Sequence, residues 1–499
     1  MPRRNRVALV QAPVFSRVGP SNALALLKAY LRRDGIPVTI HDASLGVRRS
    51  LKAAGLAWNE FQVHDADEMY RAIAGAPAGC LEAALDREAA EIVAAAPDIV
   101  GFTVQFSTES CSLELARRVK TLAPKTAVVF GGAQCVRETK AFDFIRDPFV
   151  DAVCLGEGDR SFPEFVSAFE PGGAIPPVAG FLTKDGARVV DGGDPSEIED
   201  LDALPFMDFS DFQMDVYMPE ALYIVTSRGC VRHCSFCTSI LGQKVYRRMS
   251  AERIVAEIRH QLGHYPEKCF IRFEDSLING DVSLLARLSE LLVPFRMEMA
   301  LKRSRFDFGW GALAIIHRTM SPALLTKMRH GGCQILAYGL ESGSQRVVDR
   351  MRKNFRIEDA EIVMRDTKAA GIAVKLFMMV GHPGETDEDF EETLNFLRRN
   401  DDNISVVTVS FCEILKGSHL AAHLEEYGIS PDMPDPRRWR SLDGANTIEV
   451  REARYRTLLD LIRRLGFGTE DKVCAQVFSK DLGATQWDRL AASAATPAP

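Results

Sequence analysis

Hydrophobic and polar positions follow two alternating periods along the first 165 residues of the chain. Short apolar runs such as Val7 to Gln11 and Ile99 to Thr103 are typical of buried strands. Between such runs, as over residues 21–33, apolar side chains recur three or four positions apart, which predicts amphipathic helices. Strands that alternate with helices predict a parallel sheet covered on both faces, and therefore a doubly wound, Rossmann-like α/β domain.

Glycines and polar residues follow the predicted strands of this domain, at the edge where a doubly wound sheet binds its ligand. Glycine permits the backbone to approach a ligand closely because it has no Cβ atom. The candidate binding residues at this edge are the pair Gly131 and Gly132, and the turn formed by Gly156, Glu157 and Gly158.

The segment 219–424 shows the same alternation, and its predicted strands also end in polar residues or glycine. The strands are expected at 222–226, 269–273, 334–338, 374–380 and 405–411, with a further one ending near Arg303. In a parallel barrel, the active site gathers at the carboxyl ends of the strands. The candidate residues at these ends are Asp275 and Ser276, Glu341 and Ser342, and Gly381 and Gly384.

Two other segments complete the predicted organisation. Residues 166–218 are rich in Gly, Pro and Asp, which favour turns, and they predict a linker. Residues 425–499 predict a mainly helical accessory region whose Ala- and Pro-rich end is expected to be disordered. The predicted domains are therefore 1–165, 219–424 and 425–499, with the linker between the first two.

Three cysteines share the loop that follows the strand expected at 222–226. Cys230, Cys234 and Cys237 are spaced C-x3-C-x2-C, and three such thiolates can hold three irons of a [4Fe–4S] cluster. The fourth iron then stays open to bind a small molecule. Structural zinc is closed and four-coordinate, and the next cysteine, Cys269, lies far downstream. The spacing therefore favours an iron–sulfur cluster over zinc or ordinary packing.

Composition and charge narrow the class of protein. A chain of 499 residues is longer than a single hydrophobic core normally supports, so several domains are expected. Its 46% hydrophobic and 26% charged residues are typical of a soluble globular protein. A net charge of −7 without a basic block argues against nucleic acid as a partner. No segment reaches membrane-spanning length, and a strand-like run rather than a signal peptide follows the N-terminus. We expect a cytoplasmic protein without a membrane span.

The cysteine spacing resembles the signature of the radical SAM superfamily, whose catalytic domain is a partial (β/α)6 barrel. In that superfamily, the amino and carboxylate groups of S-adenosylmethionine chelate the open iron. One electron, from a donor such as flavodoxin or ferredoxin, then yields a 5′-deoxyadenosyl radical. The resemblance therefore implies an enzyme that uses a [4Fe–4S] cluster and S-adenosylmethionine.

The same resemblance implies contacts with S-adenosylmethionine. Phe236, just before the third cysteine, would lie beside the adenine, although loop packing would also explain an aromatic residue there. Each pair of residues at a strand end would face one part of the ligand. Asp275 and Ser276 would face the methionyl amino group, and Glu341 and Ser342 would face the ribose. Gly381 and Gly384 would lie against the adenine. Taken singly, these motifs also fit a helix cap or a turn.

The N-terminal domain resembles the cobalamin-binding domain of one radical SAM subgroup, the class B methyltransferase-like enzymes. Gly131-Gly132 matches the paired glycines of that domain, and Thr103-Val104-Gln105 is a degraded form of its S-x-L signature. The histidine-bearing D-x-H-x-x-G signature is missing after the first strand. Cobalamin would then bind without a protein histidine beneath its cobalt. A domain that has lost the cofactor, or that docks a partner, is the alternative.

These features together predict a cobalamin-dependent radical SAM methyltransferase that acts on an unactivated carbon of a small-molecule or peptide substrate. A cyclase or rearrangement enzyme of the same subgroup, similar to the anaerobic tetrapyrrole cyclase, remains an alternative. So does a radical SAM enzyme whose N-terminal domain only docks a partner. A non-catalytic metal protein is disfavoured because three cysteines do not close a metal site.

Overall fold

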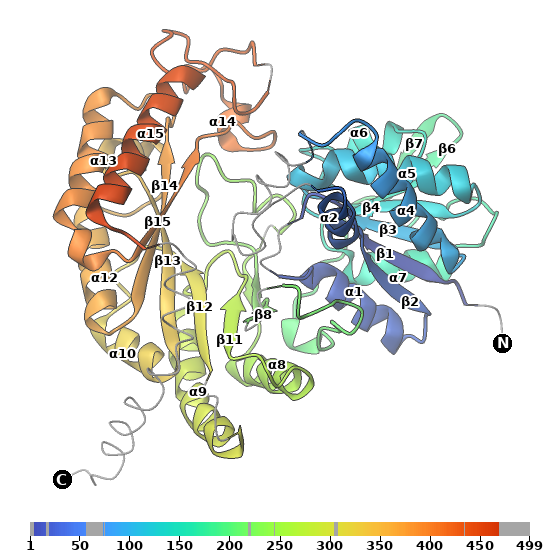
Figure 1. The fold of residues 1–499 in the computed structure, drawn as a ribbon, viewed down its shortest axis with the longest axis horizontal. Coiled ribbons are helices and arrows are strands. Elements are labelled where there is room, and N and C mark those ends of the chain that lie inside the picture. Colours follow the sequence, from blue (N-terminus) through green and yellow to red (C-terminus); the bar gives the residue numbers. More distant parts are fainter. Residues whose placement is uncertain are drawn as a thin grey trace. The chain divides into compact units, whose positions relative to one another are not determined.

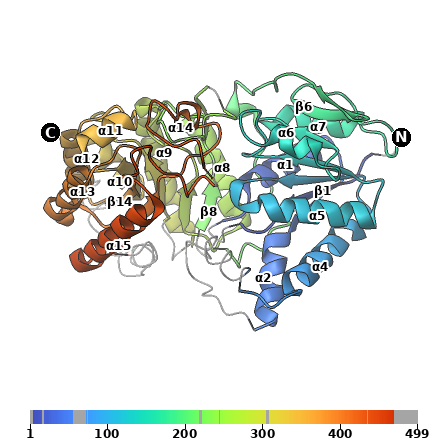
Figure 2. The same cartoon turned by 90° about the horizontal axis from the view of Figure 1, so that it is seen from above.

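The structure is a computed structural model of the 499-residue chain. It describes residues 4–15, 19–55, 73, 75–217, 221–243, 245–303, 308–433 and 435–468, and the predicted disordered tail lies outside them. The chain forms two compact units (Figures 1 and 2). The first comprises Met1–Pro219 with Leu241–Lys244, and the second comprises Glu220–Ile240 with Val245–Pro499.

The first unit is built on one sheet with the strand order β2-β1-β3-β4-β5-β6-β7. Its parallel strands are β1 (Val7–Gln11), β2 (Val38–Asp42), β3 (Ile99–Thr103), β4 (Ala127–Gly131) and β5 (Ala152–Cys154). The hairpin of β6 (Phe181–Asp185) and β7 (Arg188–Asp191) lies in the segment predicted as a linker and extends the sheet in antiparallel fashion. The doubly wound α/β fold predicted from the sequence is confirmed.

Helices cover both faces of this sheet. They are α1 (Asn22–Arg33), α2 (Ala43–Ala53), α4 (Cys80–Ala94), α5 (Glu109–Leu122), α6 (Ala141–Arg146) and α7 (Gly158–Ala168), with short 3-10 turns at Phe106–Thr108 and Leu201–Ala203. Helix α1 packs against α7, while α4 packs against both α2 and α5 (Figure 2). Alternate residues of β1 and β3, such as Val10 and Val100, are buried in the core beneath α2, α4 and α5. This core holds the carboxyl edge of the sheet in place.

The second unit is built on a six-stranded sheet in which every neighbouring pair is parallel. Its strands, in order from one edge to the other, are β15 (Val406–Phe411), β14 (Ala373–Val380), β13 (Cys333–Glu341), β12 (Gly309–Ala314), β11 (Phe270–Phe273) and β8 (Ala221–Ile224). Because β8 and β15 do not pair with each other, the barrel is open on one side. The partial barrel predicted from the sequence is confirmed.

Helices follow these strands in turn. They are α8 (Ala251–His264), α9 (Val282–Arg303), α10 (Pro322–His330), α11 (Gln345–Arg350), α12 (Ile357–Ala369), α13 (Asp387–Arg399) and α15 (Ile448–Leu465), with a 3-10 turn at Asp401–Asn403. The prediction of a strand ending near Arg303 is wrong, since α9 extends through that residue and the strand is β12. Residues 291–301 mix apolar side chains with Pro294, Arg296 and Glu298, a pattern that fits either element, and the structure shows a helix that packs against α8 and α10.

Short elements surround the carboxyl ends of these strands. An antiparallel ribbon of β9 (Ser227–Arg228) and β10 (Arg247–Arg248) brackets the three cysteines. The small helix α14 (His419–Ala422) follows β15, and α15 packs against α13 (Figure 1). Among the described helices, none is both long and apolar enough to cross a membrane.

Candidate functional site

The cysteine loop leaves the end of β8 and is held by backbone contacts from distant parts of the second unit. The amide of Ser235, between the second and third cysteines, donates to the carbonyl of Met351 over 2.9 Å. The carbonyl of Ser235 in turn accepts from the amide of Leu420, also over 2.9 Å. The three thiols are half-buried and free. The loop is therefore fixed by its backbone, while its sulfur atoms remain available as ligands.

The spacing of the thiols distinguishes two kinds of metal site. Among the described residues, Cys230, Cys234 and Cys237 do not form a group that converges closely enough to hold one ion. Thiolates that each bind a separate iron of a cluster do not need to converge in that way. The loop is therefore compatible with a cluster in which each thiolate binds a separate iron.

Lys353 links Phe236 of the cysteine loop to Glu341 at the end of β13, and both of these residues were predicted from the sequence. Its ammonium group lies 3.2 Å from Oε1 of Glu341 and 5.5 Å from the ring centroid of Phe236. Burial raises the pKa of the Cys230 and Cys234 thiols, and the positive charge of Lys353 opposes that shift. Lys353 thus favours the thiolate form of these cysteines. Sequence analysis missed this lysine because it lies beyond α11, outside every strand end.

Glu341 occupies an unusual backbone conformation at the end of β13. Its φ angle is +69°, and the register between β13 and β14 shifts at this point. Arg352 and Asn354, which flank Lys353, also have positive φ angles, of 58° and 52°. Such conformations are strained for residues other than glycine and concentrate at functional sites. The Glu341 carboxylate at this position contacts Lys353.

Ser342, the neighbour of Glu341, is fully buried and is already engaged by the protein. Its hydroxyl lies 3.1 Å from that of Thr393 and accepts from the amide of Ser344 over 3.1 Å. The hydroxyl of Ser344 donates to Asp389 over 2.7 Å. These contacts tie the end of β13 to α13. Of the predicted pair, the Ser342 hydroxyl is therefore used within the protein, whereas the Glu341 carboxylate pairs with Lys353.

Asp275 supports the start of the cysteine loop. Its buried carboxylate accepts hydrogen bonds from the amide and the hydroxyl of Thr226, over 2.8 and 2.9 Å, and from the hydroxyl of Ser227 over 2.8 Å. Burial raises the pKa of Asp275 to about 6, although these donors act in the opposite direction. Ser276 is exposed. The structure therefore shows Asp275 positioning the residues that precede Cys230.

The loop that follows β14 contains both predicted glycines, each in a left-handed conformation. The φ angles of Gly381 and Gly384 are +80° and +82°. A Cβ atom on Gly381 would collide with the side chain of Arg451, and one on Gly384 would lie 2.9 Å from Nε of Arg350. Both the backbone conformation and these arginine side chains require glycine at the two positions.

His382, between these glycines, joins the loop to the cysteine loop. Its Nε2 atom lies 3.3 Å from the hydroxyl of Ser235, and the side chain is fully buried. Burial lowers the pKa of His382 to about 3, so the ring is neutral near pH 7. From the C-terminal region, the amide of Asn446 donates to the carbonyl of Gly381 over 3.2 Å. Sequence analysis did not identify His382 or Asn446, since neither belongs to a recognisable motif.

The carboxyl edge of the first sheet brings together Thr103, Gly131 and Gly132. Thr103 and Gly131 are neighbours in the register of β3 and β4. Gly132 has a φ angle of +103°, and a Cβ atom there would lie 3.0 Å from the backbone nitrogen and oxygen of Val104. At the next turn, Gly156 has a φ angle of +59°, and the buried Glu157 precedes Gly158 at the start of α7.

Gln11 is a further residue at this edge that sequence analysis missed. It ends β1, and its register neighbours are Thr103 and Asp42. The side chain is only 1% exposed, yet neither amide atom has a hydrogen-bond partner among the described residues. Because an unpaired buried amide is costly, this arrangement suits a polar ligand that would complete it. The available signal was a glutamine at the end of an otherwise apolar strand.

Comparisons with known proteins identify a family match for the second unit and several relatives of the chain. Residues 224–397 match the Radical SAM superfamily. The chain is 27% identical over 348 residues to an uncharacterized methyltransferase from Pyrococcus horikoshii, an alignment that covers 69% of this chain and 72% of the relative. It is 25% identical over 340 residues to the cytidylyl-2-hydroxyethylphosphonate methyltransferase of Streptomyces wedmorensis, covering 59% of this chain and 60% of that enzyme.

A solved structure shares the folds of both units. It is the radical S-adenosylmethionine methyltransferase TsrM from Kitasatospora setae, with cobalamin and a [4Fe–4S] cluster bound. The TM-score is 0.66, and the match covers 91% of this chain and 85% of TsrM. At 16% identity, this likeness shows a common fold.

Proposed function

We propose that the chain is a cobalamin-dependent radical SAM enzyme that transfers a methyl group to an unactivated carbon, because residues 224–397 match the Radical SAM superfamily. The observation that carries the proposal is the convergence of the cysteine loop, Phe236 and Glu341 around Lys353. Distant segments of the chain supply these groups, so their meeting at one end of the barrel is not a consequence of local sequence.

The donor set around Lys353 fits a [4Fe–4S] cluster with S-adenosylmethionine. Cys230, Cys234 and Cys237 would hold three irons of the cluster, which supplies the electron that cleaves the bound sulfonium. Glu341 can accept hydrogen bonds from ribose hydroxyls, and Phe236 offers an aromatic face for the adenine. The half-buried position of the loop limits the access of water to these groups.

The carboxyl edge of the first sheet fits the nucleotide tail of cobalamin. The unpaired amide of Gln11 can both donate and accept, and Thr103 adds a hydroxyl beside it. Gly132 adopts a φ angle of +103° and packs so closely against Thr103 and Val104 that a Cβ atom would lie 3.0 Å from both residues, which holds this turn beside Thr103. When bound, cobalamin supplies a cobalt centre that carries a methyl group. The chain's own residues would bind and orient the tail.

The relatives support methyl transfer among the reactions of this superfamily, because two of them are named as methyltransferases. In this proposal, the molecule that receives the methyl group is a small molecule or a peptide, and flavodoxin or ferredoxin donates the electron. The ten described cysteines are all free, which suits the reducing conditions of the cytoplasm.

The test is a labelling experiment on anaerobically reconstituted protein. The protein is loaded with cluster, hydroxocobalamin and reductant, and then receives S-adenosylmethionine with a labelled methyl group. Label recovered on cobalamin supports the proposal. Cleavage of S-adenosylmethionine without any cobalamin binding would overturn it and leave a radical enzyme with a docking domain. Cobalamin binding without methyl transfer would instead favour the cyclase or rearrangement reaction.

A further inference from the structure

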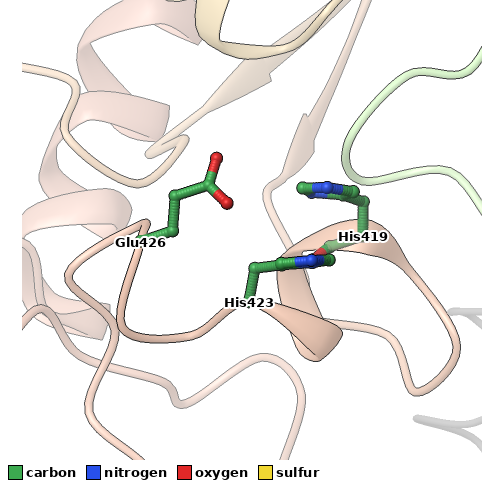
Figure 3. Close-up of side chains that lie close together, drawn as sticks. All are labelled: His419, His423 and Glu426. Atoms are coloured by element: carbon green, nitrogen blue, oxygen red, sulfur yellow. The ribbon is translucent and has the colours of Figure 1, made fainter.

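Two histidines and a glutamate meet in the segment that follows β15, outside the site described above. His419 begins α14, His423 caps its end, and Glu426 lies in the following turn. Their ligand atoms all lie within 4.8 Å of one another. Figure 3 shows the Glu426 carboxylate pointing toward the two rings. Among the described residues, this is the one group of at least three histidine, cysteine or acidic side chains whose ligand atoms lie close enough together to hold a single ion.

The residue types suit a first-row divalent cation. Histidines four positions apart lie on one face of a helical turn, which is a spacing used to bind zinc. Imidazole nitrogen and carboxylate oxygen are both common zinc ligands, and three protein ligands leave a fourth position for water. We propose that His419, His423 and Glu426 bind one Zn²⁺ ion.

The hydrogen bonding of His423 prepares its ring for metal binding. Its Nδ1 atom lies 2.9 Å from the carbonyl oxygen of His419. A carbonyl only accepts, so Nδ1 must carry the proton and Nε2 keeps its lone pair. Zinc-binding histidines commonly donate their other ring N–H to a backbone carbonyl in this way.

His419 provides an independent observation in favour of a ligand. Its Nδ1 atom is buried and has no hydrogen-bond partner among the described residues. A buried polar atom without a partner is uncommon, and coordination of a cation at this ring would account for it. The rings of His419 and His423 stack with centroids 3.8 Å apart, so binding requires the His419 ring to rotate while His423 keeps its hydrogen bond. Glu426 is exposed and can move toward the ion without disturbing the core.

The two histidines and Glu426 lie in a segment that contacts the cysteine loop, so an ion bound there would affect that loop. Leu420, within α14, donates its amide to Ser235 of the cysteine loop over 2.9 Å. Arg352, whose neighbour Lys353 contacts Glu341, lies 3.4 Å from the carboxylate of Glu426. A zinc ion would cross-link the two ends of this segment and hold α14 against the cysteine loop. The ion would be distinct from the irons of the cluster.

The test measures zinc in cluster-loaded protein, so that iron occupies the three cysteines. The protein is dialysed against a chelator, and its zinc affinity is then measured by competition with a fluorescent zinc indicator. We expect one zinc ion per chain. The variants His423→Ala and Glu426→Gln should each weaken the affinity by about tenfold or more. Both residues are exposed, and thermal melting with chelator present checks that the variants fold.

Two further variants separate this site from others in the chain. His260 and His264 on α8 are also four positions apart, with ring centroids at 4.5 Å, and no third ligand among the described residues joins them. His264→Ala should therefore retain the wild-type zinc affinity. A variant with Cys230, Cys234 and Cys237 all changed to Ser should still bind one zinc ion, whether or not the proposed reaction is correct. Absence of zinc binding in that variant, or unchanged affinity in His423→Ala, would overturn the proposal.

Discussion

The guanidinium group of Arg454 donates to the carboxylate of Glu385 over 2.8 Å, and both side chains are buried. The same carboxylate accepts from the amide of Gly381, also over 2.8 Å. Arg454 lies on α15, in the C-terminal region, whereas Glu385 ends the glycine-containing loop after β14. The C-terminal helix therefore helps to set the shape of a loop that sequence analysis assigned to the adenine of S-adenosylmethionine.

Replacing this arginine should destabilise the second unit strongly. Arg454→Ala leaves the Glu385 carboxylate buried without its cation, which typically costs about 3–5 kcal/mol in the free energy of unfolding. Chemical denaturation measures the change. Arg463 on the same helix pairs with Asp460, and both side chains are at least half exposed. Arg463→Ala should cost less than about 1 kcal/mol. Equal effects of the two substitutions would contradict the assigned role.

Each cysteine of the loop should be needed for the cluster. Cys230→Ala, Cys234→Ala and Cys237→Ala each remove the thiolate of one iron. Iron content after anaerobic reconstitution should fall to a minor fraction of the wild-type value, and cleavage of S-adenosylmethionine should be lost. Cys269→Ala serves as the matched control, because this half-buried cysteine lies in the same unit outside the loop. Full cleavage activity in any of the three loop variants would defeat the assignment.

Glu341 should contribute to binding S-adenosylmethionine and not to holding iron. A lost charge-assisted hydrogen bond in a buried site costs roughly 2–3 kcal/mol, so Glu341→Ala should weaken binding at least about tenfold. Isothermal titration with the cluster-loaded protein measures the affinity, and iron content should be unchanged. Glu358→Ala, at an exposed position of α12, is the control. Unchanged affinity in Glu341→Ala would assign Glu341 to local structure alone.

Gly132 should be essential for cobalamin binding. The φ angle of +103° disfavours leucine, and its Cβ atom would lie 3.0 Å from the Val104 backbone and from Oγ1 of Thr103, so Gly132→Leu should displace this turn and abolish binding of hydroxocobalamin. Absorbance of the protein after gel filtration reports bound cobalamin. Gly186→Leu is a matched control, because Gly186 also has a positive φ angle but a Cβ atom there would meet no described atom within 4 Å. If Gly132→Leu still bound hydroxocobalamin, the prediction that Gly131 and Gly132 belong to the cobalamin site would be wrong.

Stability below neutral pH should depend on Asp389. Burial alone would raise the pKa of this carboxyl, but hydrogen bonds from Arg346, Thr386 and Ser344 outweigh it and hold the pKa at about 2. Because the pKa is lower in the folded than in the unfolded protein, the ionised group stabilises the fold above the unfolded value. That contribution is lost as the pH falls from about 4 toward 2.

The measurement compares unfolding of the wild type and Asp389→Asn across this range. The difference in stability between the two proteins should be full at pH 6 and should shrink steadily below pH 4. A difference that does not change with pH would show that the carboxylate charge contributes nothing. Asp460→Asn is the control, since the Asp460 carboxylate is half exposed and its ion pair with Arg463 lies at the surface of α15.

Local patterns were sufficient for most of the fold because strands and helices carry their own periods. Val7–Gln11 and Ile99–Thr103 were predicted as strands with the bounds that the structure shows. Two segments were exceptions. Before Arg303 the pattern does not separate a helix from a strand, and the structure has α9 there, packed against α8 and α10. The segment predicted as a linker contains the hairpin of β6 and β7, which pairs with β5.

The sequence by itself determined the cysteine spacing, the alternation of strands and helices and the glycines at the strand ends. These features depend on residues close together in the chain. Only the tertiary structure identified Lys353 beside Glu341, the unpaired amide of Gln11 and the contact of Arg454 with Glu385. A side chain acquires such a role from the groups that it contacts, and those groups come from distant segments whose meeting no local pattern encodes.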